Sequence, residues 1–321
     1  MEKIGIASGV VLYIEIVEGR QYGTFHNIKT NDKAYVNEDM LSVVTHVLSG
    51  AELVSFFPDD LEAGLRRDLL RQCQDYLSEL EASGFIGAGR GGGLIKTVSA
   101  NPPLRVLFLE TTKNCNLRCR HCYVTDCQKP KADEQLTYAE IIRIIDEADK
   151  LGVMELQLTG GEFFMIPQAP EILAELGRRL IPCSIFTNGT LLPDEVLEYL
   201  KGSPGGLIFY ISIDGPETVH DEFRGLPGAY RKTINTVKTL LEIGCDVRIN
   251  TAVGNHNADC MRDFIAYIQS EFGVLHRLVA IDPVGRAAGK DALRVSPEKF
   301  AELLSANGGN FKFLDSHDTL A

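Results

Sequence analysis

Short apolar stretches come first along the chain, and apolar stripes of helical spacing follow them. Short apolar runs bounded by turn residues predict strands, and apolar stripes spaced by three or four residues predict amphipathic helices. The predicted elements are strands at 10–16 and 22–28, a helix capped by Asn37, a longer helix from Asp59 or Asp60, and a strand or wing from Phe85. We therefore predict that residues 1–87 form a small α+β domain of the winged-helix type.

A glycine-rich segment interrupts this pattern. Five of the seven residues 87–93 are glycine, and Pro102 and Pro103 follow. Such a composition is typical of a flexible tether. A phosphate-binding loop is the alternative, but the segment lacks the Gly-Lys-Ser/Thr ending of such loops. We predict that residues 88–103 are a linker.

From residue 104 onward, short apolar runs alternate with amphipathic stripes. The predicted strands are 104–109, 154–158, 183–187, 207–213, 247–253 and 278–281. The predicted helices are one that starts at Thr137 with Glu140 in a capping box, and others at 172–180, 195–200, 233–243, 261–272 and 296–304. Repeated strand–helix units predict an α/β fold with a parallel sheet, a partial (β/α)6 barrel over residues 104–290.

Charge and composition limit the partners of the chain. Its 321 residues carry a formal net charge of −12. Because phosphate binding needs clustered Lys and Arg, we expect no nucleic acid as a partner. No apolar stretch approaches the roughly 18 residues that a membrane span needs, and the N-terminus lacks the layout of a signal peptide. We expect a cytoplasmic protein that does not bind membranes.

Cysteines are crowded after the first predicted strand of the barrel. Cys115, Cys119 and Cys122 have the spacing C-x3-C-x2-C. Three thiolates in this spacing can bind three irons of a cubane cluster and leave the fourth iron open for a substrate or cofactor. A structural zinc site with His121 or Cys127 as its fourth ligand is the alternative. Such sites usually combine two ligand clusters, and no second cluster follows here.

Polar turn motifs follow later strands, at the edge of the sheet where parallel barrels carry their chemistry. The candidate residues are Gly160, Gly161 and Glu162 after the second strand, Asn188 after the third, and Ser212, Asp214 and Arg224 after the fourth. Adjacent glycines let a ligand approach the backbone, so that an ammonium group can reach the carbonyls. A hydroxyl and a guanidinium near one mouth can hold a carboxylate.

Residues 104–290 resemble the radical S-adenosylmethionine (SAM) superfamily. The cysteine motif ending in Tyr123 and the Thr-Gly-Gly-Glu motif carry the resemblance, although Phe163 stands where the family often has proline. It implies a [4Fe–4S] cluster on the three cysteines, with SAM on the open iron. Its implied cofactor-binding residues are Gly160, Gly161 and Glu162 at the amino end of SAM, Ser212 and Arg224 at its carboxylate and ribose side, and Tyr123, Asn188 and Asp214 in addition. A ferredoxin- or flavodoxin-type donor would supply the electron that cleaves SAM to a 5′-deoxyadenosyl radical.

Residues 1–87 resemble the peptide-recognition (RRE) domain of enzymes that modify ribosomally made peptides. The stretches Val-Asn-Glu-Asp…Val-Leu-Ser-Gly and Leu-Ser-Glu-Leu-Glu-Ala-Ser-Gly-Phe-Ile carry this resemblance. It implies that the leader of a precursor peptide adds a strand to a sheet edge, offered by 10–16 or 22–28. A DNA-binding winged helix is the rival interpretation. Residues 1–86 hold seven Lys or Arg against fourteen Asp or Glu, a net charge of −7 that would repel phosphate.

The sequence therefore predicts a radical SAM enzyme that forms a thioether or carbon–carbon cross-link in a precursor peptide. Two alternatives stay open: a radical SAM enzyme acting on a haem-type or quinone-type cofactor precursor, and a non-catalytic, zinc-dependent peptide-binding protein. The segment Ser-Ile-Asp-Gly-Pro…His-Asp-Glu-Phe-Arg-Gly resembles the SPASM or twitch subgroup, whose members carry auxiliary clusters in a C-terminal domain. Residues 291–321 are expected to be the start of that extension, in a truncated chain.

Overall fold

The structure, a computed structural model, divides into two compact units. It describes residues 4–17, 19–58, 60–89, 91–98, 104–124, 135–202 and 205–307. The first unit comprises residues 1–107, 142–156 and 174–182, and the second comprises residues 108–141, 157–173 and 183–321. Among the described residues, no helix has the length and apolar character needed to cross a membrane.

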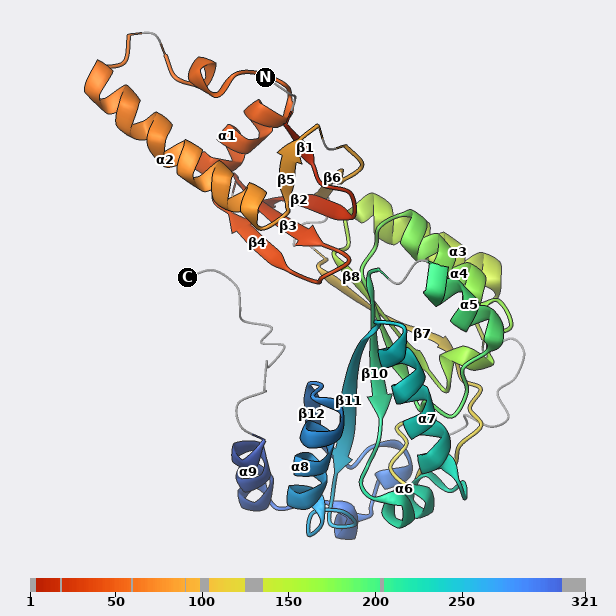
Figure 1. Cartoon of the computed structure of the whole chain (residues 1–321). Helices are drawn as coiled ribbons and strands as arrows, with labels where there is room; N and C mark the ends of the chain where they lie inside the picture. Colours follow the sequence, from red (N-terminus) through yellow and green to blue (C-terminus); the bar gives the residue numbers. More distant parts are fainter. Residues whose placement is uncertain are drawn as a thin grey trace. The chain divides into compact units, whose positions relative to one another are not determined.

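The first unit is built around a four-stranded sheet with the order β4-β3-β2-β6 (Figure 1). Its strands are β2 (Val10–Val17), β3 (Arg20–Asn27), β4 (Lys33–Val36) and β6 (Leu94–Val98). The remaining elements are the antiparallel pair β1 (Ile4–Ile6) and β5 (Ile86–Ala88), and the helices α1 (Glu38–Leu48) and α2 (Ala63–Ala82). Asn37 caps α1 as predicted, because its side chain accepts a hydrogen bond from the backbone N–H of Met40.

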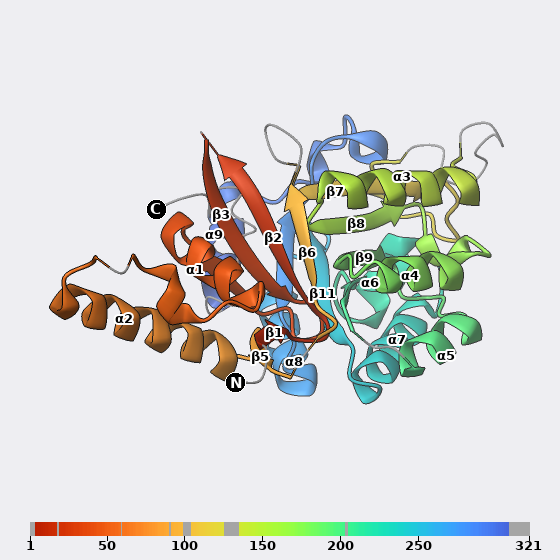
Figure 2. The same ribbon diagram turned by 90° about the horizontal axis from the view of Figure 1, so that it is seen from above.

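Strand β2 contributes to two hydrophobic cores, one on each face of the sheet. Val10 and Leu12 pack in the core that includes side chains of α1 and α2, which lie on the same side of β2 and β3 (Figure 2). Val11 and Tyr13 pack in a second core, which also includes Met154. Successive side chains of a strand point to opposite faces, so a strand covered on both faces reads as a continuous apolar run.

The strand order corrects two expectations from the sequence. β2 and β3 were expected to offer a free edge, but each is paired on both sides, and the edge strands are β4 and β6. β6 lies within residues 88–103, so this segment is not a linker throughout. Gly93, which directly precedes β6, is needed for packing, because a Cβ there would lie 2.2 Å from the Ile6 side chain and 2.7 Å from the Ala7 carbonyl oxygen.

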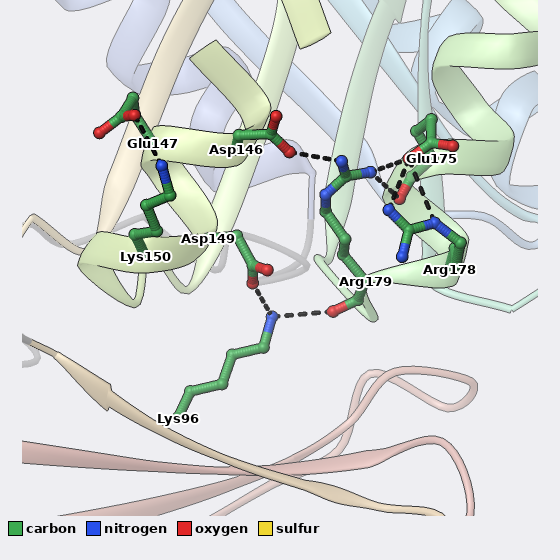
Figure 3. A network of polar contacts seen from close by, with 8 residues as sticks. All are labelled: Lys96, Asp146, Glu147, Asp149, Lys150, Glu175, Arg178 and Arg179. Atoms are coloured by element: carbon green, nitrogen blue, oxygen red, sulfur yellow. Dashed lines mark hydrogen bonds and ion pairs between the residues drawn. The ribbon is translucent and has the colours of Figure 1, made fainter. Parts of the chain in front are cut away.

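An ionic network joins β6 to two helices, α3 (Tyr138–Leu151) and α4 (Ala169–Arg178) (Figure 3). The Lys96 ammonium donates to Asp149 Oδ1 at 2.6 Å and to the backbone oxygen of Arg179 at 2.8 Å. Only 10% of the Lys96 side chain is exposed. Arg179 in turn pairs with Asp146 and Glu175. The network therefore ties the edge strand to helices that are distant from it in the sequence.

Replacing Lys96 with alanine should lower the free energy of unfolding by about 2 kcal/mol, because Asp149 would lose its partner and two hydrogen bonds of a charged group would disappear. Urea denaturation, monitored by circular dichroism, measures the free energy of unfolding. Lys150→Ala is the matched control, since the Lys150–Glu147 pair is exposed (69% and 61%) and should leave the midpoint unchanged. Equal losses in both variants would contradict the role given to Lys96.

The six-stranded parallel sheet runs in chain order from β7 to β12 (Figure 1). Its strands are β7 (Val106–Thr112), β8 (Glu155–Gly160), β9 (Cys183–Thr187), β10 (Leu207–Ser212), β11 (Asp246–Val253) and β12 (His276–Ala280). The further helices are α5 (Asp194–Gly202), α6 (Glu217–Arg224), α7 (Ala229–Glu242), α8 (Met261–Phe272) and α9 (Pro297–Ala306). The predicted α/β fold is confirmed.

Local sequence signals set most of these boundaries. β9 and α8 have the predicted ends, and the other strands of this sheet differ by no more than three residues at either end. The capping box before α3 forms, with the Thr137 N–H donating to Glu140 Oε2 at 2.8 Å. Helix α6 was missed, because its eight residues are mostly polar and too few to show a clear period.

Candidate functional site

The three clustered cysteines lie on one loop that follows β7 and docks against the end of α6. Backbone N–H groups of Arg118 and Arg120 donate to the carbonyls of Arg224 and Phe223, both at 3.0 Å. Cys119 is buried, whereas Cys115 and Cys122 are partly exposed. Helix α6 therefore holds the middle of the cysteine loop, and Cys119 is the member of the motif nearest to the interior.

Gly160 and Gly161 make room for the start of the cysteine loop. The Gly161 N–H donates to Thr112 O at 2.6 Å, and the Glu162 N–H donates to Asn114 O at 2.7 Å. A Cβ on Gly161 would lie 2.0 Å from Asn114 O, and one on Gly160 would lie 2.2 Å from Thr112 O. The sequence suggested that these glycines admit a ligand. In the structure, the atoms that approach them are backbone atoms of the chain itself.

Glu162 is fully buried and connects the end of β8 to the end of β9. Its carboxylate accepts hydrogen bonds from the Thr187 hydroxyl at 2.8 Å, from the Asn188 N–H at 2.8 Å and from the Phe164 N–H at 3.2 Å. Burial raises the pKa of Glu162, and these donors oppose the rise. Thr187 is a site residue that the sequence analysis missed, although its place at a strand end was a usable signal.

Asn188 links this turn to the cysteine loop. Its Nδ2 donates to Asn116 Oδ1 at 2.9 Å and lies 4.0 Å from Cys115 Sγ, and its Oδ1 accepts from the Thr190 N–H at 2.8 Å. Cys115 Sγ also accepts from the Leu117 N–H at 3.4 Å. Donors are thus directed at this sulfur from two segments of the chain, and Asn116 is a second residue that the sequence analysis missed.

Asp214 and Arg224 form a buried ion pair that also contacts a cysteine. Arg224 Nε donates to Asp214 Oδ2 at 2.7 Å, and Nη1 lies 3.7 Å from Cys119 Sγ. Burial is the largest influence on the pKa of Asp214 and by itself would raise it. The charge and hydrogen bond of Arg224, together with the nearby His121 and His220, outweigh burial and lower the pKa to about 2. Burial raises the pKa of the Cys119 thiol, while Arg224 acts in the opposite direction.

Ser212 and Tyr123 lie at more accessible positions. Ser212 ends β10, is partly buried and pairs in register with Asn250 of β11. The Tyr123 side chain is 48% exposed, and its hydroxyl interacts with Thr159 and Glu110. These two candidates are therefore not part of the buried group formed by Glu162, Asp214 and Arg224.

Aromatic rings pack beside the cysteine loop. His121 stacks on Phe223 with ring centroids 4.8 Å apart, and Phe223 stacks on His256. Burial lowers the pKa of each histidine to about 4, so both rings are neutral at pH 7. Within the described residues, His121 Nδ1 has no hydrogen-bond partner. His121, the candidate fourth zinc ligand, thus packs on an aromatic ring, while Cys127 lies outside the described residues.

The donor chemistry of the loop fits an iron–sulfur cluster, although no three His, Cys, Asp or Glu side chains in the described ranges are gathered so that they could hold a metal ion. Iron–sulfur clusters are bound by thiolates, and their sulfurs accept hydrogen bonds. Both Cys115 and Cys119 already face N–H donors. Three thiols on one loop with such donors are the ligand set that a cubane cluster with one open iron requires.

Comparison with known proteins places this site in a family. Residues 109–268 match the family model described as Radical SAM superfamily. The chain is 31% identical over 206 residues to an AdoMet-dependent heme synthase of Nitratidesulfovibrio vulgaris, covering 64% of this chain and 56% of that protein. It is 34% identical over 201 residues to the antilisterial bacteriocin subtilosin biosynthesis protein AlbA of Bacillus subtilis, covering 62% and 43%. The chain thus spans about half the length of these curated relatives.

The whole fold also has a solved counterpart. The crystal structure of Streptococcus suis SuiB bound to precursor peptide SuiA matches with a TM-score of 0.63 over 94% of this chain and 68% of that one, at 15% sequence identity. At this identity the likeness concerns the fold, an N-terminal unit with a small mixed sheet followed by the six-stranded parallel sheet. With residues 109–268 matching the family model, the chain belongs to the radical SAM superfamily, which implies a [4Fe–4S] cluster and SAM.

Proposed function

We propose that this radical SAM enzyme modifies a ribosomally made precursor peptide, with its cluster on Cys115, Cys119 and Cys122. The observation that carries the proposal is the cysteine loop itself. It is fixed by the glycine turn after β8 on one side and by α6 on the other, with N–H donors directed at two of its sulfurs. When bound, the cluster and SAM supply the reductive cleavage that yields a 5′-deoxyadenosyl radical.

The residues of the chain position and shield this centre. Glu162 and Asn188 lock the turns after β8 and β9 against the cysteine loop, so the loop is held before the cofactor binds. Ser212 and Tyr123, which are more accessible, are the candidates for direct contact with SAM. A ferredoxin- or flavodoxin-type protein would provide the electron.

Anaerobic reconstitution with iron and sulfide tests the chemistry. The expected result is visible absorption typical of a [4Fe–4S] cluster, and dithionite-dependent cleavage of SAM to methionine and 5′-deoxyadenosine. A chain that binds zinc tightly, gains no such absorption and cleaves no SAM would contradict the proposal and support the zinc-dependent binding protein.

A peptide substrate is supported by the edge strands of the first unit. β4 lies at one edge of the four-stranded sheet, and its Tyr35 side chain is 70% exposed. The Tyr35 carbonyl oxygen accepts a hydrogen bond from the Tyr76 hydroxyl of α2 at 3.3 Å rather than from a further strand. A leader peptide that adds a strand beside β4 would bind the backbone of this edge strand and lie next to helix α2. The other edge strand, β6, is engaged by the Lys96 network.

Replacing Tyr35 with proline should weaken binding of the leader peptide at least about 10-fold, because proline removes the N–H that an added strand would use while an edge strand tolerates it. Fluorescence anisotropy with a labelled leader from the neighbouring small open reading frame measures the affinity, on the full chain because β6 completes the sheet. Tyr35→Phe keeps the backbone donor and is the control. Equal affinity of both variants would exclude β4 as the docking edge.

A small-molecule substrate is the second candidate, since heme synthases are among the relatives at 29–32% identity, beside AlbA at 34%. Co-expression of the chain with the neighbouring small peptide, followed by mass spectrometry, separates the two. A mass loss of about two hydrogens per cross-link supports peptide modification. An unmodified peptide together with turnover of a porphyrin would favour the small molecule.

A further inference from the structure

Arg224 occupies an unusual position for a charged side chain. It is the last residue of α6, it is 7% exposed, and its guanidinium lies between a carboxylate and a thiol. One nitrogen donates to Asp214 at 2.7 Å, and another lies 3.7 Å from Cys119 Sγ. A buried guanidinium of this kind persists only where its charge and donors are matched by partners.

The partner of Arg224 is itself held firmly. Asp214 Oδ1 accepts from the Ala252 N–H at 3.0 Å, and the Asp214 carbonyl accepts from Asn257 Nδ2 at 2.7 Å. The Asp214 side chain is fully buried. Asp214 therefore holds the Arg224 guanidinium in one orientation. The guanidinium in turn directs an N–H group at Cys119 Sγ.

The backbone next to Arg224 also holds the cysteine loop in place. Gly225, directly after Arg224, is left-handed with φ of 72°, and a Cβ there would lie 3.1 Å from the Arg118 carbonyl oxygen. The N–H groups on both sides of Cys119, those of Arg118 and Arg120, donate to the end of α6. Cys119 is thus held from both its backbone and its side chain by one helix end.

We propose that Arg224 is a positioning residue for Cys119 that tunes the reduction potential of the cluster, balanced by Asp214. The inference rests on the proposed cluster ligands. It gives the buried guanidinium a role that differs from holding the carboxylate of SAM, because its donors are directed at Asp214 and Cys119.

The physical basis is the charge of the reduced cluster. Hydrogen bonds to the cysteine sulfurs and the net charge nearby both set the potential of an iron–sulfur cluster. An N–H···S contact from a cation stabilises the reduced, more negative state. Asp214 opposes this with its negative charge. Removing the cation and removing the anion should therefore move the potential in opposite directions.

The test is a redox titration of the full reconstituted chain, followed by electron paramagnetic resonance in the absence of SAM. Arg224→Gln should shift the midpoint to a more negative potential, and Asp214→Asn should shift it to a more positive one. Arg224→Lys keeps the charge and should show a smaller shift than Arg224→Gln. Arg231→Gln is the matched control: Arg231 is 79% exposed, pairs with Glu217, and should leave the midpoint unchanged.

The outcomes separate the possible roles. If Arg224 holds the SAM carboxylate instead, Arg224→Gln weakens SAM binding while the midpoint without SAM stays as in the wild type. Arg224→Gln could fail to load a cluster, and the other two variants then decide. The inference is supported if Arg224→Lys loads a cluster and Asp214→Asn has a more positive midpoint potential. An unchanged midpoint potential in Asp214→Asn overturns it. Shifts of the same sign in Arg224→Gln and Asp214→Asn also overturn it. A wild-type chain that loads no cluster overturns the proposed function itself.

Discussion

Replacing Cys119 with alanine is expected to leave the reconstituted chain without [4Fe–4S] absorption and to reduce SAM cleavage to the level of cluster-free protein. The proposed cluster has three thiolate ligands and one open iron. Cys119 is 7% exposed, so an external thiol or water has poor access to the vacated position. The loss would also remove the sulfur that Arg224 contacts at 3.7 Å. Iron and sulfide content, visible absorption and chromatography of 5′-deoxyadenosine measure the effect.

Cys73→Ala is the matched control for this experiment. Cys73 is buried to a similar degree, with 6% exposure, but lies in α2 of the first unit. It should keep its cluster and its SAM cleavage, because a scattered buried cysteine acts as a small apolar residue. If Cys119→Ala retained wild-type absorption and SAM cleavage, the assignment of the cluster ligands would be wrong.

Replacing Gly161 with alanine should lower the free energy of unfolding by about 3 kcal/mol or more. The added Cβ would lie 2.0 Å from the Asn114 carbonyl oxygen and 2.4 Å from its carbonyl carbon. Both are backbone atoms, and the adjacent Glu162 N–H is bonded to the same oxygen at 2.7 Å. The clash is relieved only if the start of the cysteine loop moves away from β8. Urea denaturation and cluster loading measure the two consequences.

Gly202→Ala provides the comparison. Gly202 ends α5, and its φ is not in the left-handed region. Apart from its chain neighbours and the backbone of its own helix, no described residue has an atom within 4 Å of the Cβ that alanine would add. The free energy of unfolding of Gly202→Ala should change by less than about 1 kcal/mol. A small increase is expected, because alanine lowers the conformational entropy of the unfolded chain. Wild-type stability and loading in Gly161→Ala would show that the loop does not depend on this close approach.

The cysteine motif and the strand–helix alternation were readable because each is a local signal. β9 depends on a short apolar run and α8 on an apolar stripe, and both were predicted with their observed ends. The cap of α1 by Asn37 is equally local, since donor and acceptor are three residues apart. Such features need no knowledge of what the segment packs against.

The edge strands of the first unit were not readable in this way. Short apolar stretches identified β2 and β3, but which strand lies at the edge depends on β6. That strand follows β3 by more than sixty residues and comes directly after a glycine run. The glycines of that run suggested flexibility. Gly93 instead lets the backbone before β6 lie close to Ile6, and these two segments are far apart in the sequence.

The sequence by itself determined that three thiols share one loop after a barrel strand, that glycine turns and polar residues follow the next strands, and that the chain has an α/β sheet. Those properties follow from spacing and periodicity along the chain. Only the tertiary structure decided that Gly161 accommodates the Asn114 backbone, and that Arg224 lies between Asp214 and Cys119. Arg224 and Cys119 are 105 residues apart. Because a side chain takes its role from the groups that burial brings next to it, such roles appear only when distant segments meet.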